Sequence, residues 1–223
     1  MGQTIAFIGG TGPQGRGLAT RFTLAGHHVV IGSRQAERGV AAAATVAAAV
    51  PQHREALVGM TNEDAAATAE LVVVTVPYAG HRPTLEALAP ALAGKIVVDV
   101  VVPVRFDTGP HLIDVEAGSA TEEAAAALPH SRVVGAFHSL PASVLLDPAA
   151  AVDADVLVTG TDKEAKQTVC ALAEQIEGVR AVDAGPLHFS RFVKGLTVLL
   201  IGINGRYEAQ TAPRISGLPQ TNA

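Results

Sequence analysis

Residues 9–17 read G-G-T-G-P-Q-G-R-G and contain Gly10, Gly12 and Gly15 in the spacing G-x-G-x-x-G. They follow a short apolar run, residues 4–8, and precede a segment whose apolar residues recur at helical spacing. In such a context the first glycine permits a tight turn, the second lets the backbone approach a pyrophosphate, and the third lets helix and strand pack closely. Free amides at a helix N-terminus also favour an anion. The spacing therefore predicts a dinucleotide-binding loop.

Basic side chains follow the second expected strand, residues 28–31. A site specific for NAD places Asp or Glu there, about 20 residues after the glycine loop, to bind the ribose. This chain instead has Ser33, Arg34 and, one helical turn later, Arg38. A charge-assisted Arg–phosphate bond contributes on the order of 1.5–3 kcal/mol, enough for a roughly tenfold to hundredfold preference. These residues therefore predict a site for the 2′-phosphate of NADP(H).

The side chains that hydrolysis or metal chemistry requires are missing from the sequence. It contains no Ser/His/Asp, Cys/His or paired-carboxylate constellation. Its eight histidines and one cysteine do not have metal-ligand spacing. Hydride transfer between two flat rings depends on positioning, while the coenzymes carry the reaction. We therefore expect no catalytic side chain and no metal.

The elements that position these residues alternate between strand and helix patterns. The runs at 71–76, 96–102 and 133–137 are rich in β-branched residues, which is typical of strands buried on both faces of a parallel sheet. A weaker strand is expected at 57–60, and residues 105–119 are expected to form a loop. Helical patterns lie between the strands, at 14–25, 35–49, 83–92 and 122–128. The alternation predicts an α/β, Rossmann-type, doubly wound and mostly parallel sheet over residues 1–143.

The rest of the chain predicts a smaller C-terminal α/β unit, residues 144–210. Strands are expected at 155–159 and 179–182, and helices at 162–176 and 187–203. The last helix is apolar on more than one face, which favours a homodimer. Residues 211–223 lack periodicity, so we expect a flexible tail.

Composition restricts the partners and the compartment. A formal charge of −5 provides no field that would attract nucleic acid or an anionic membrane. The apolar run at 196–203 is well short of the ~20 residues of a membrane helix. Because Cys170 is the only cysteine, an intrachain disulfide is impossible. We expect a cytoplasmic protein with no nucleic-acid or membrane partner.

Six motifs across nearly the whole chain resemble the family of F-420-dependent NADP oxidoreductases. The motifs are G-G-T-G-P-Q-G-R-G, I-G-S-R at 31–34, T-V-P at 75–77, V-V-P-V at 101–104, F-H-S-L-P-A at 137–142 and D-A-G-P-L at 183–187. Members of this family exchange hydride between NADP(H) and an 8-hydroxy-5-deazaflavin coenzyme, F-420. One position differs from the family pattern, because Lys194 stands where an acidic residue tends to follow Arg191.

The resemblance implies a set of site residues and a reductase activity in which NADP is donor or acceptor. It assigns the pyrophosphate to Thr11, Gly12, Pro13 and Gln14. It assigns the 2′-phosphate to Ser33, Arg34 and Arg38. The adenosine side and the nicotinamide path would be flanked by Thr75, Val76 and Pro77. The pocket in which the deazaflavin stacks on the nicotinamide would be lined by His138, Ser139, Leu140, Pro141 and Ala142.

Two other functions are compatible with the same residues. One is an NADPH-dependent reductase of an imine, a flavin, a quinone or a ferric chelate. A carbonyl or imine reductase requires a proton donor, and His138 is the plausible one. The other is a non-catalytic NADP(H) sensor that reports redox state through a partner protein.

Overall fold

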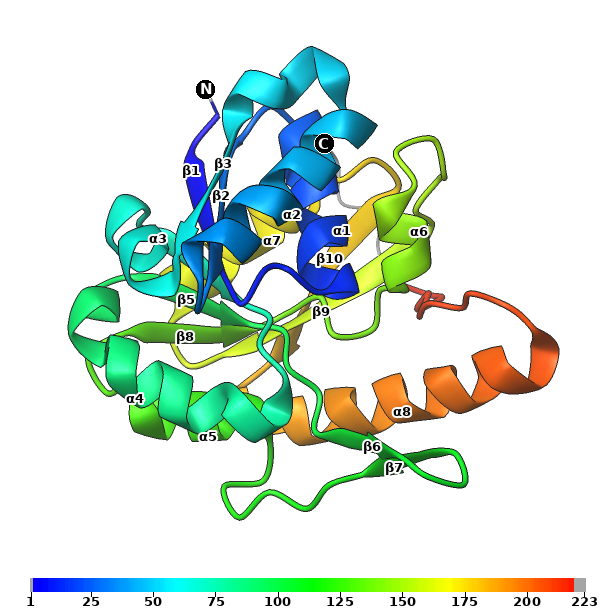
Figure 1. Ribbon diagram of the computed structural model, residues 1–223. Helices are drawn as coiled ribbons and strands as arrows, with labels where there is room; N and C mark the ends of the chain where they lie inside the picture. The colour runs from blue at the N-terminus through cyan, green and yellow to red at the C-terminus, as the bar shows by residue number, and fades with distance from the viewer. Residues whose placement is uncertain (1, 219–223) are drawn as a thin grey trace.

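The apolar runs form the strands of one twisted sheet in the computed structural model, which describes residues 2–218 (Figure 1). The strand order is β10-β9-β8-β5-β4-β1-β2-β3, and all neighbours are parallel except β8 and β9. The strands are β1 (Thr4–Ile8), β2 (His28–Ser33), β3 (Leu57–Thr61), β4 (Leu71–Val74), β5 (Ile96–Asp99), β8 (Arg132–Gly135), β9 (Ala154–Gly160) and β10 (Val179–Gly185).

Helices cover both faces of this sheet. One face carries α1 (Pro13–Leu24), α2 (Ala36–Ala49), α6 (Ala142–Leu146) and α7 (Lys163–Ala173), and the other carries α3 (Asn62–Thr68), α4 (His81–Leu92) and α5 (Ala120–Ala127). Side chains of β1 alternate accordingly, with Phe7 in the core beneath α1 and Ile8 in the core beneath α3. Burial on both faces explains why the central strands are continuously apolar. The predicted Rossmann-type fold is confirmed.

Three short 3₁₀ helices connect these elements, η1 (Pro51–Ala56), η2 (Tyr78–Gly80) and η3 (Leu187–Phe189). Helix α8 (Ser190–Tyr207) follows η3 and lies along one side of the molecule, away from the middle of the sheet (Figure 1). No helix among residues 2–218 is long and apolar enough to cross a membrane.

The structure differs from the sequence prediction at the carboxyl edge of the sheet. The strands predicted at 71–76, 96–102 and 133–137 all end earlier, because the chain leaves the sheet there to form the site. The loop predicted over 105–119 is wrong in its first part. That part completes a hairpin of β6 (Val104–Phe106) and β7 (Pro110–Leu112), which lies beside α8. Strands of this length are too short to show a period of two.

The C-terminal elements extend the main sheet. Strand β9 pairs with β8, and Val156 and Val158 pack in the same core as Phe7 and Leu18. Sequence separation hides such a pairing, since β9 follows β8 only after α6 and a loop.

The start of the predicted flexible tail is held by a buried carboxylate, contrary to expectation. Asp155 accepts hydrogen bonds from Arg180, from Arg214 at 2.9 Å and from the backbone amide of Ile215 at 2.6 Å. Burial opposes ionisation, but these donors outweigh it and lower the pKa of Asp155 to about 2. The carboxylate therefore fixes residues 213–215 against β9, while residues 219–223 of the predicted tail lie outside the described residues.

Candidate functional site

The glycine loop lies at the junction of β1 and α1. The glycines of this loop differ in what would surround an added side chain. A methyl group added at Gly15 would lie 2.7 Å from Gly10 Cα, and one at Gly10 would lie 2.7 Å from Phe7 Cβ. Packing therefore excludes side chains at both positions. Around Gly12, the N-cap of α1, no atom of residues 2–218 other than Gly12 itself and its chain neighbours Thr11 and Pro13 lies within 4 Å of such a methyl group. A glycine with open space at a helix N-terminus allows a pyrophosphate to approach the protein backbone closely.

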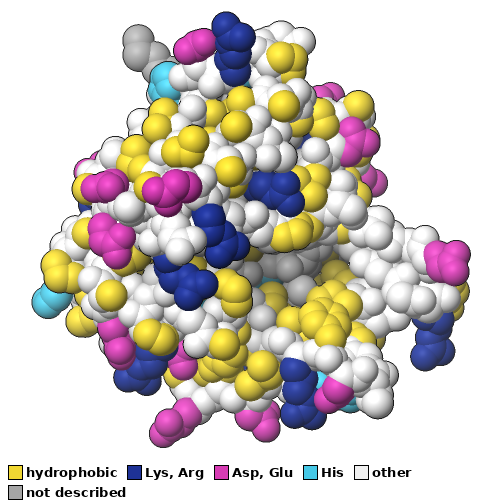
Figure 2. Space-filling view, in the orientation of Figure 1, with side chains coloured by type: hydrophobic (Ala, Val, Ile, Leu, Met, Phe, Trp, Pro, Cys, Tyr) yellow, Lys and Arg dark blue, Asp and Glu magenta, His cyan; other side chains and the backbone are white. Residues whose placement is uncertain are grey.

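The end of β2 presents guanidinium groups at the start of α2. Ser33 is buried, and Arg34 and Arg38 are exposed on either side of Gln35, the N-cap of α2. Neither guanidinium forms an ion pair with any of the residues that the structure describes. Figure 2 shows Lys and Arg side chains gathered over the starts of α1 and α2, next to a hollow in the surface. A phosphate placed here would meet unpaired positive charge as well as the positive end of the α2 dipole.

The end of β4 is fixed against the glycine loop. Both the backbone amide and the hydroxyl of Thr75 donate to the Ile8 carbonyl, at 2.9 and 3.3 Å. Val76 packs against Gly9, whose φ of 70° and close contact with Val76 leave no room for a side chain. Pro77 follows on the surface. These contacts hold residues 75–77 at the carboxyl edge, where open α/β sheets bind ligands.

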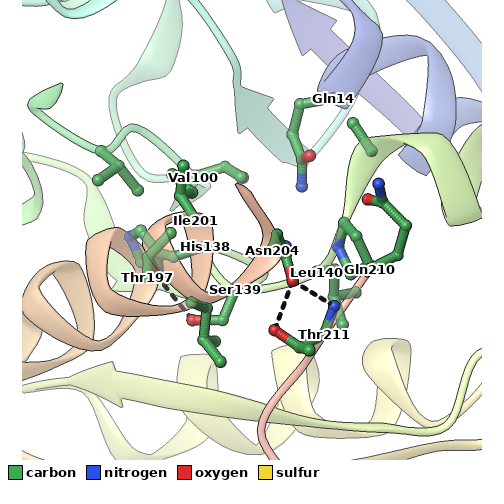
Figure 3. A pocket seen from close by; sticks show the side chains of 14 residues that line it. Gln14, Val100, His138, Ser139, Leu140, Thr197, Ile201, Asn204, Gln210 and Thr211 are labelled. Atoms are coloured by element: carbon green, nitrogen blue, oxygen red, sulfur yellow. Dashed lines mark hydrogen bonds between the residues drawn. The ribbon is translucent and has the colours of Figure 1, made fainter. Parts of the chain in front are cut away.

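A cavity of about 320 Å³ opens beside this edge, between the segment after β8 and helix α8 (Figure 3). It is lined by Gln14 and by all five residues of the predicted pocket, His138, Ser139, Leu140, Pro141 and Ala142. The other predicted site residues lie outside this cavity, namely Gly10, Thr11, Gly12, Pro13, Gly15, Ser33, Arg34, Arg38, Thr75, Val76 and Pro77. The structure thus separates an edge formed by the glycine loop, the end of β2 and the end of β4 from a pocket, with Gln14 at their junction.

Sequence reasoning missed the far wall of this cavity, which is formed by Val100, Val102, Thr197, Leu200, Ile201, Asn204, Gln210 and Thr211. The α8 members are spaced i, i+3, i+4 and i+7, so they share one helix face. Nothing in the sequence shows which apolar face of α8 faces a cavity.

Hydrogen bonds close the wall on the α8 side. Ser139 Oγ and Thr197 Oγ1 are 2.8 Å apart. Asn204 Oδ1 accepts from both the amide and the hydroxyl of Thr211 at 2.7 Å (Figure 3). These bonds tie the segment after β8 to α8, and α8 to the returning chain.

His138 is nearly buried in this wall. Burial lowers the pKa of His138, and Nδ1 has no hydrogen-bond partner among the described residues. Nε2 lies 3.5 Å from Thr121 Oγ1. The lowered pKa favours the neutral imidazole, which is suited to contact an aromatic ring.

A buried ion cluster supports the end of β5, directly before Val100. His81 Nε2 lies 2.9 Å from Asp99 Oδ1, and its Nδ1 lies 3.2 Å from Glu123 Oε1. Burial opposes the charge, yet the two carboxylates raise the pKa of His81. The cluster fixes α4, α5 and β5 to one another behind the cavity.

Arg191, at the start of α8, is paired with another helix. It forms a bidentate ion pair with Glu122 of α5, with Nη2 2.7 Å from Oε1 and Nε 2.9 Å from Oε2. Arg191 therefore has an acidic partner in Glu122, although position 194 is occupied by lysine.

An open parallel sheet with a glycine loop and a basic second strand end defines a Rossmann-type dinucleotide-binding protein. Residues 4–103 match the family described as NADP oxidoreductase coenzyme F420-dependent. The chain is 41% identical over 226 residues to an F420-dependent NADP reductase of Methanothermobacter thermautotrophicus, covering 99% of this chain and 97% of that protein. The corresponding reductase of Methanocaldococcus jannaschii is 40% identical, with 96% and 98% covered.

A solved structure is similar to this chain over nearly its full length. It is described as a putative F420-dependent NADP reductase from Arthrobacter, with a TM-score of 0.81, 32% identity, and coverage of 95% of this chain and 97% of that chain. The chain belongs to the F420-dependent NADP oxidoreductase family, and the resemblance predicted from the motifs is confirmed.

Proposed function

We infer that this chain transfers a hydride between NADP(H) and the deazaflavin coenzyme F-420. The observation that carries this function is about 40% identity to named F420-dependent NADP reductases over nearly the full length, which includes both the phosphate-binding edge and the pocket. When bound, NADPH supplies the hydride and becomes NADP⁺, and the deazaflavin gains that hydride together with a proton from solvent.

The residues at the carboxyl edge divide the work of binding. The backbone N–H groups of Thr11, Gly12 and Gln14 face the pyrophosphate, and Pro13, which has no N–H, starts α1 beside it. The free space beside Gly12 supports this role. Ser33, Arg34 and Arg38 hold the 2′-phosphate, and Thr75, Val76 and Pro77 flank the adenosine and the nicotinamide path. Such a site fits NADP(H) because its unpaired guanidiniums lie where an acidic residue would otherwise bind the ribose.

The pocket contributes by positioning the deazaflavin and by excluding water. His138, Ser139, Leu140, Pro141 and Ala142 form the wall against which the deazaflavin lies, and a cavity of about 320 Å³ is within the usual range for a ligand site. Apolar side chains of the wall exclude water, which favours transfer between rings held roughly 3–3.5 Å apart. His138 contributes as a neutral wall residue, and no side chain acts as a catalytic acid or base.

NADPH oxidation with authentic F-420, followed by the absorbance of both coenzymes, tests this function. We expect turnover with F-420 and little or none with a flavin, a quinone, a ferric chelate or a cyclic imine. Preferred turnover with one of those acceptors would support the alternative reductase. Tight binding of NADPH without turnover on any acceptor would indicate a sensor.

We also propose that the chain is a homodimer joined through α8 and the β6–β7 hairpin. Large apolar side chains are exposed there, including Phe192 and Leu199 on α8 and Phe106 on the hairpin. A groove of about 770 Å³ separates the two elements. Apolar surface of this extent on adjacent elements is typical of an interface. Sedimentation velocity should give twice the chain mass of 22.7 kDa, and a monomer at micromolar concentration would contradict the dimer.

Two remaining assignments are proposals of the same kind. We propose that residues 1–143 bind NADP(H) and that residues 144–210 form a smaller C-terminal unit, whose strands join the same sheet and whose helix α8 completes the pocket. The protein works in the cytoplasm, where a reducing environment keeps a single cysteine as a free thiol. Burial raises the pKa of Cys170 to about 11, so the reactive thiolate is scarce.

A further inference from the structure

The backbone turns sharply between β8 and the pocket wall at a residue that is not glycine. Phe137 has a φ of 61°, and within residues 2–218 it shares a positive φ with only one other non-glycine residue. This region is unfavourable for a residue with a Cβ atom, so its surroundings must hold it. The turn directs the following residues, His138 to Ala142, toward the cavity.

Helix α1 supplies the contacts that hold this turn. Gln14 Nε2 donates a hydrogen bond to the Phe137 carbonyl at 3.2 Å. The Phe137 ring packs edge to face on Phe22, with ring centroids 5.7 Å apart and planes at 83°. Both the side chain and the peptide of Phe137 are therefore oriented from α1.

The same helix also holds the other end of the wall. The buried guanidinium of Arg21 donates to the carbonyls of Leu145, at 3.1 Å, and of Asp147, at 2.6 Å. A methyl group at Gly17 would lie 2.6 Å from Leu145 Cβ, so α1 and α6 are in direct contact. Arg21 satisfies carbonyls at the end of α6, which have no partner within so short a helix. These contacts attach the end of the wall to α1.

Gln14 differs from these buried contacts because it belongs to both binding regions. It is the second residue of α1, directly after Pro13, and its side chain lines the cavity. Its backbone amide is free for the pyrophosphate, while its side-chain amide points into the cavity and reaches the Phe137 carbonyl (Figure 3).

We propose that Gln14 is a positioning residue that sets the orientation of the deazaflavin wall through the Phe137 carbonyl and so couples the NADP site to the second pocket. This inference rests on the proposed function. Without the side-chain donor, the Phe137 carbonyl keeps the 3.5 Å hydrogen bond from the Leu140 amide and the ring keeps its packing on Phe22, but the peptide loses its link to α1. The unfavourable Phe137 backbone can then relax, and residues 138–142 shift with it. Because hydride transfer requires close alignment, a displacement of about 1 Å can lower its rate on the order of 100-fold.

Two substitutions remove the donor while keeping the size of the side chain. Gln14→Met removes all polarity, and Gln14→Glu retains the shape but can only accept. Gln52→Met, in the exposed helix η1, is the matched control. Thermal unfolding shows whether each variant is folded, and Gln14→Glu takes the place of Gln14→Met if the latter is not.

The first measurement is hydrogen–deuterium exchange of residues 137–146 in the coenzyme-free protein, which is independent of activity. We expect residues 137–146 to exchange faster in both Gln14 variants than in the wild-type protein. Their exchange in Gln52→Met should equal that of the wild-type protein. In single turnovers with NADPH and F-420, Gln14→Met should slow hydride transfer by about tenfold or more and increase its deuterium isotope effect. Its dissociation constant for NADPH should stay within about twofold of the wild-type value.

Unchanged exchange in both Gln14 variants would overturn the positioning role. So would a weaker affinity for NADPH with an unchanged rate of hydride transfer, because the Gln14 side chain would then be a pyrophosphate ligand. If the wild-type protein does not reduce F-420, the proposed function fails, and the exchange measurement still decides whether Gln14 orients the wall.

Discussion

Replacing Arg34 and Arg38 together by Ala is expected to weaken the binding of NADPH by about 100-fold while changing the affinity for NADH by less than about threefold. Both guanidiniums are exposed at the start of α2 and unpaired within the described chain, so each can bind a phosphate oxygen without breaking an existing ion pair. Solvent screens exposed charges, which places the effect near about tenfold for each arginine. NADH lacks the 2′-phosphate and therefore loses no contact.

Isothermal titration with both dinucleotides at two salt concentrations would measure this selectivity. The matched control is Arg54→Ala with Arg82→Ala, which removes the same charge from two exposed arginines paired with Glu55 and Glu86. The control should leave the ratio of NADPH to NADH affinity unchanged. Equal loss of both dinucleotides in the Arg34/Arg38 variant, or equal affinity of the wild-type protein for both, would refute the assignment of the 2′-phosphate.

The strand, glycine loop and helix at this edge of the sheet, and the basic end of β2, were predictable because their signals are local. Three glycines, two arginines and the flanking strand and helix patterns lie within about 40 residues, and each has a physical requirement that the sequence itself expresses. The pocket behaves differently. Its predicted half, residues 138–142, came from a family motif, whereas Thr197 and Asn204 were missed because helical spacing does not reveal what lies opposite a helix.

Long-range pairing explains the remaining differences. The sequence does not show that β9 joins β8 in an antiparallel pair, or that the β6–β7 hairpin lies beside α8, because strand partners far apart in the chain have no local signature. The turn at Phe137 is hidden for another reason. Positive φ is normally indicated by Gly or Asn, whereas Phe137 has it here while its carbonyl and ring contact Gln14 and Phe22. Residues bound by such tertiary contacts become visible only in the folded chain.

Gly12→Leu is expected to abolish detectable binding of both NADPH and NADH, a loss of at least about 100-fold, while the protein stays folded. The N-cap φ of −76° and ψ of 169° are open to any residue, and apart from Gly12 and its two chain neighbours no described atom lies within 4 Å of an added methyl group. The fold therefore accepts the side chain, which instead occupies the space that the pyrophosphate needs. Gly15→Leu should act differently and destabilise the protein, because Gly10 and Thr75 already touch that position at 2.7 and 2.8 Å.

Comparing Gly12→Leu with Gly15→Leu distinguishes a loss of dinucleotide binding from a loss of folding stability. Differential scanning fluorimetry should give Gly12→Leu a melting temperature within a few degrees (~3 °C) of the wild-type value and no shift on adding NADPH, since a ligand raises stability only if it binds the folded state. Gly205→Leu, a glycine in α8 with open space beside it, is the control and should retain the NADPH-induced shift. A normal shift in Gly12→Leu would mean that the dinucleotide does not approach this helix end, and the sites proposed for both coenzymes would have to be reassigned.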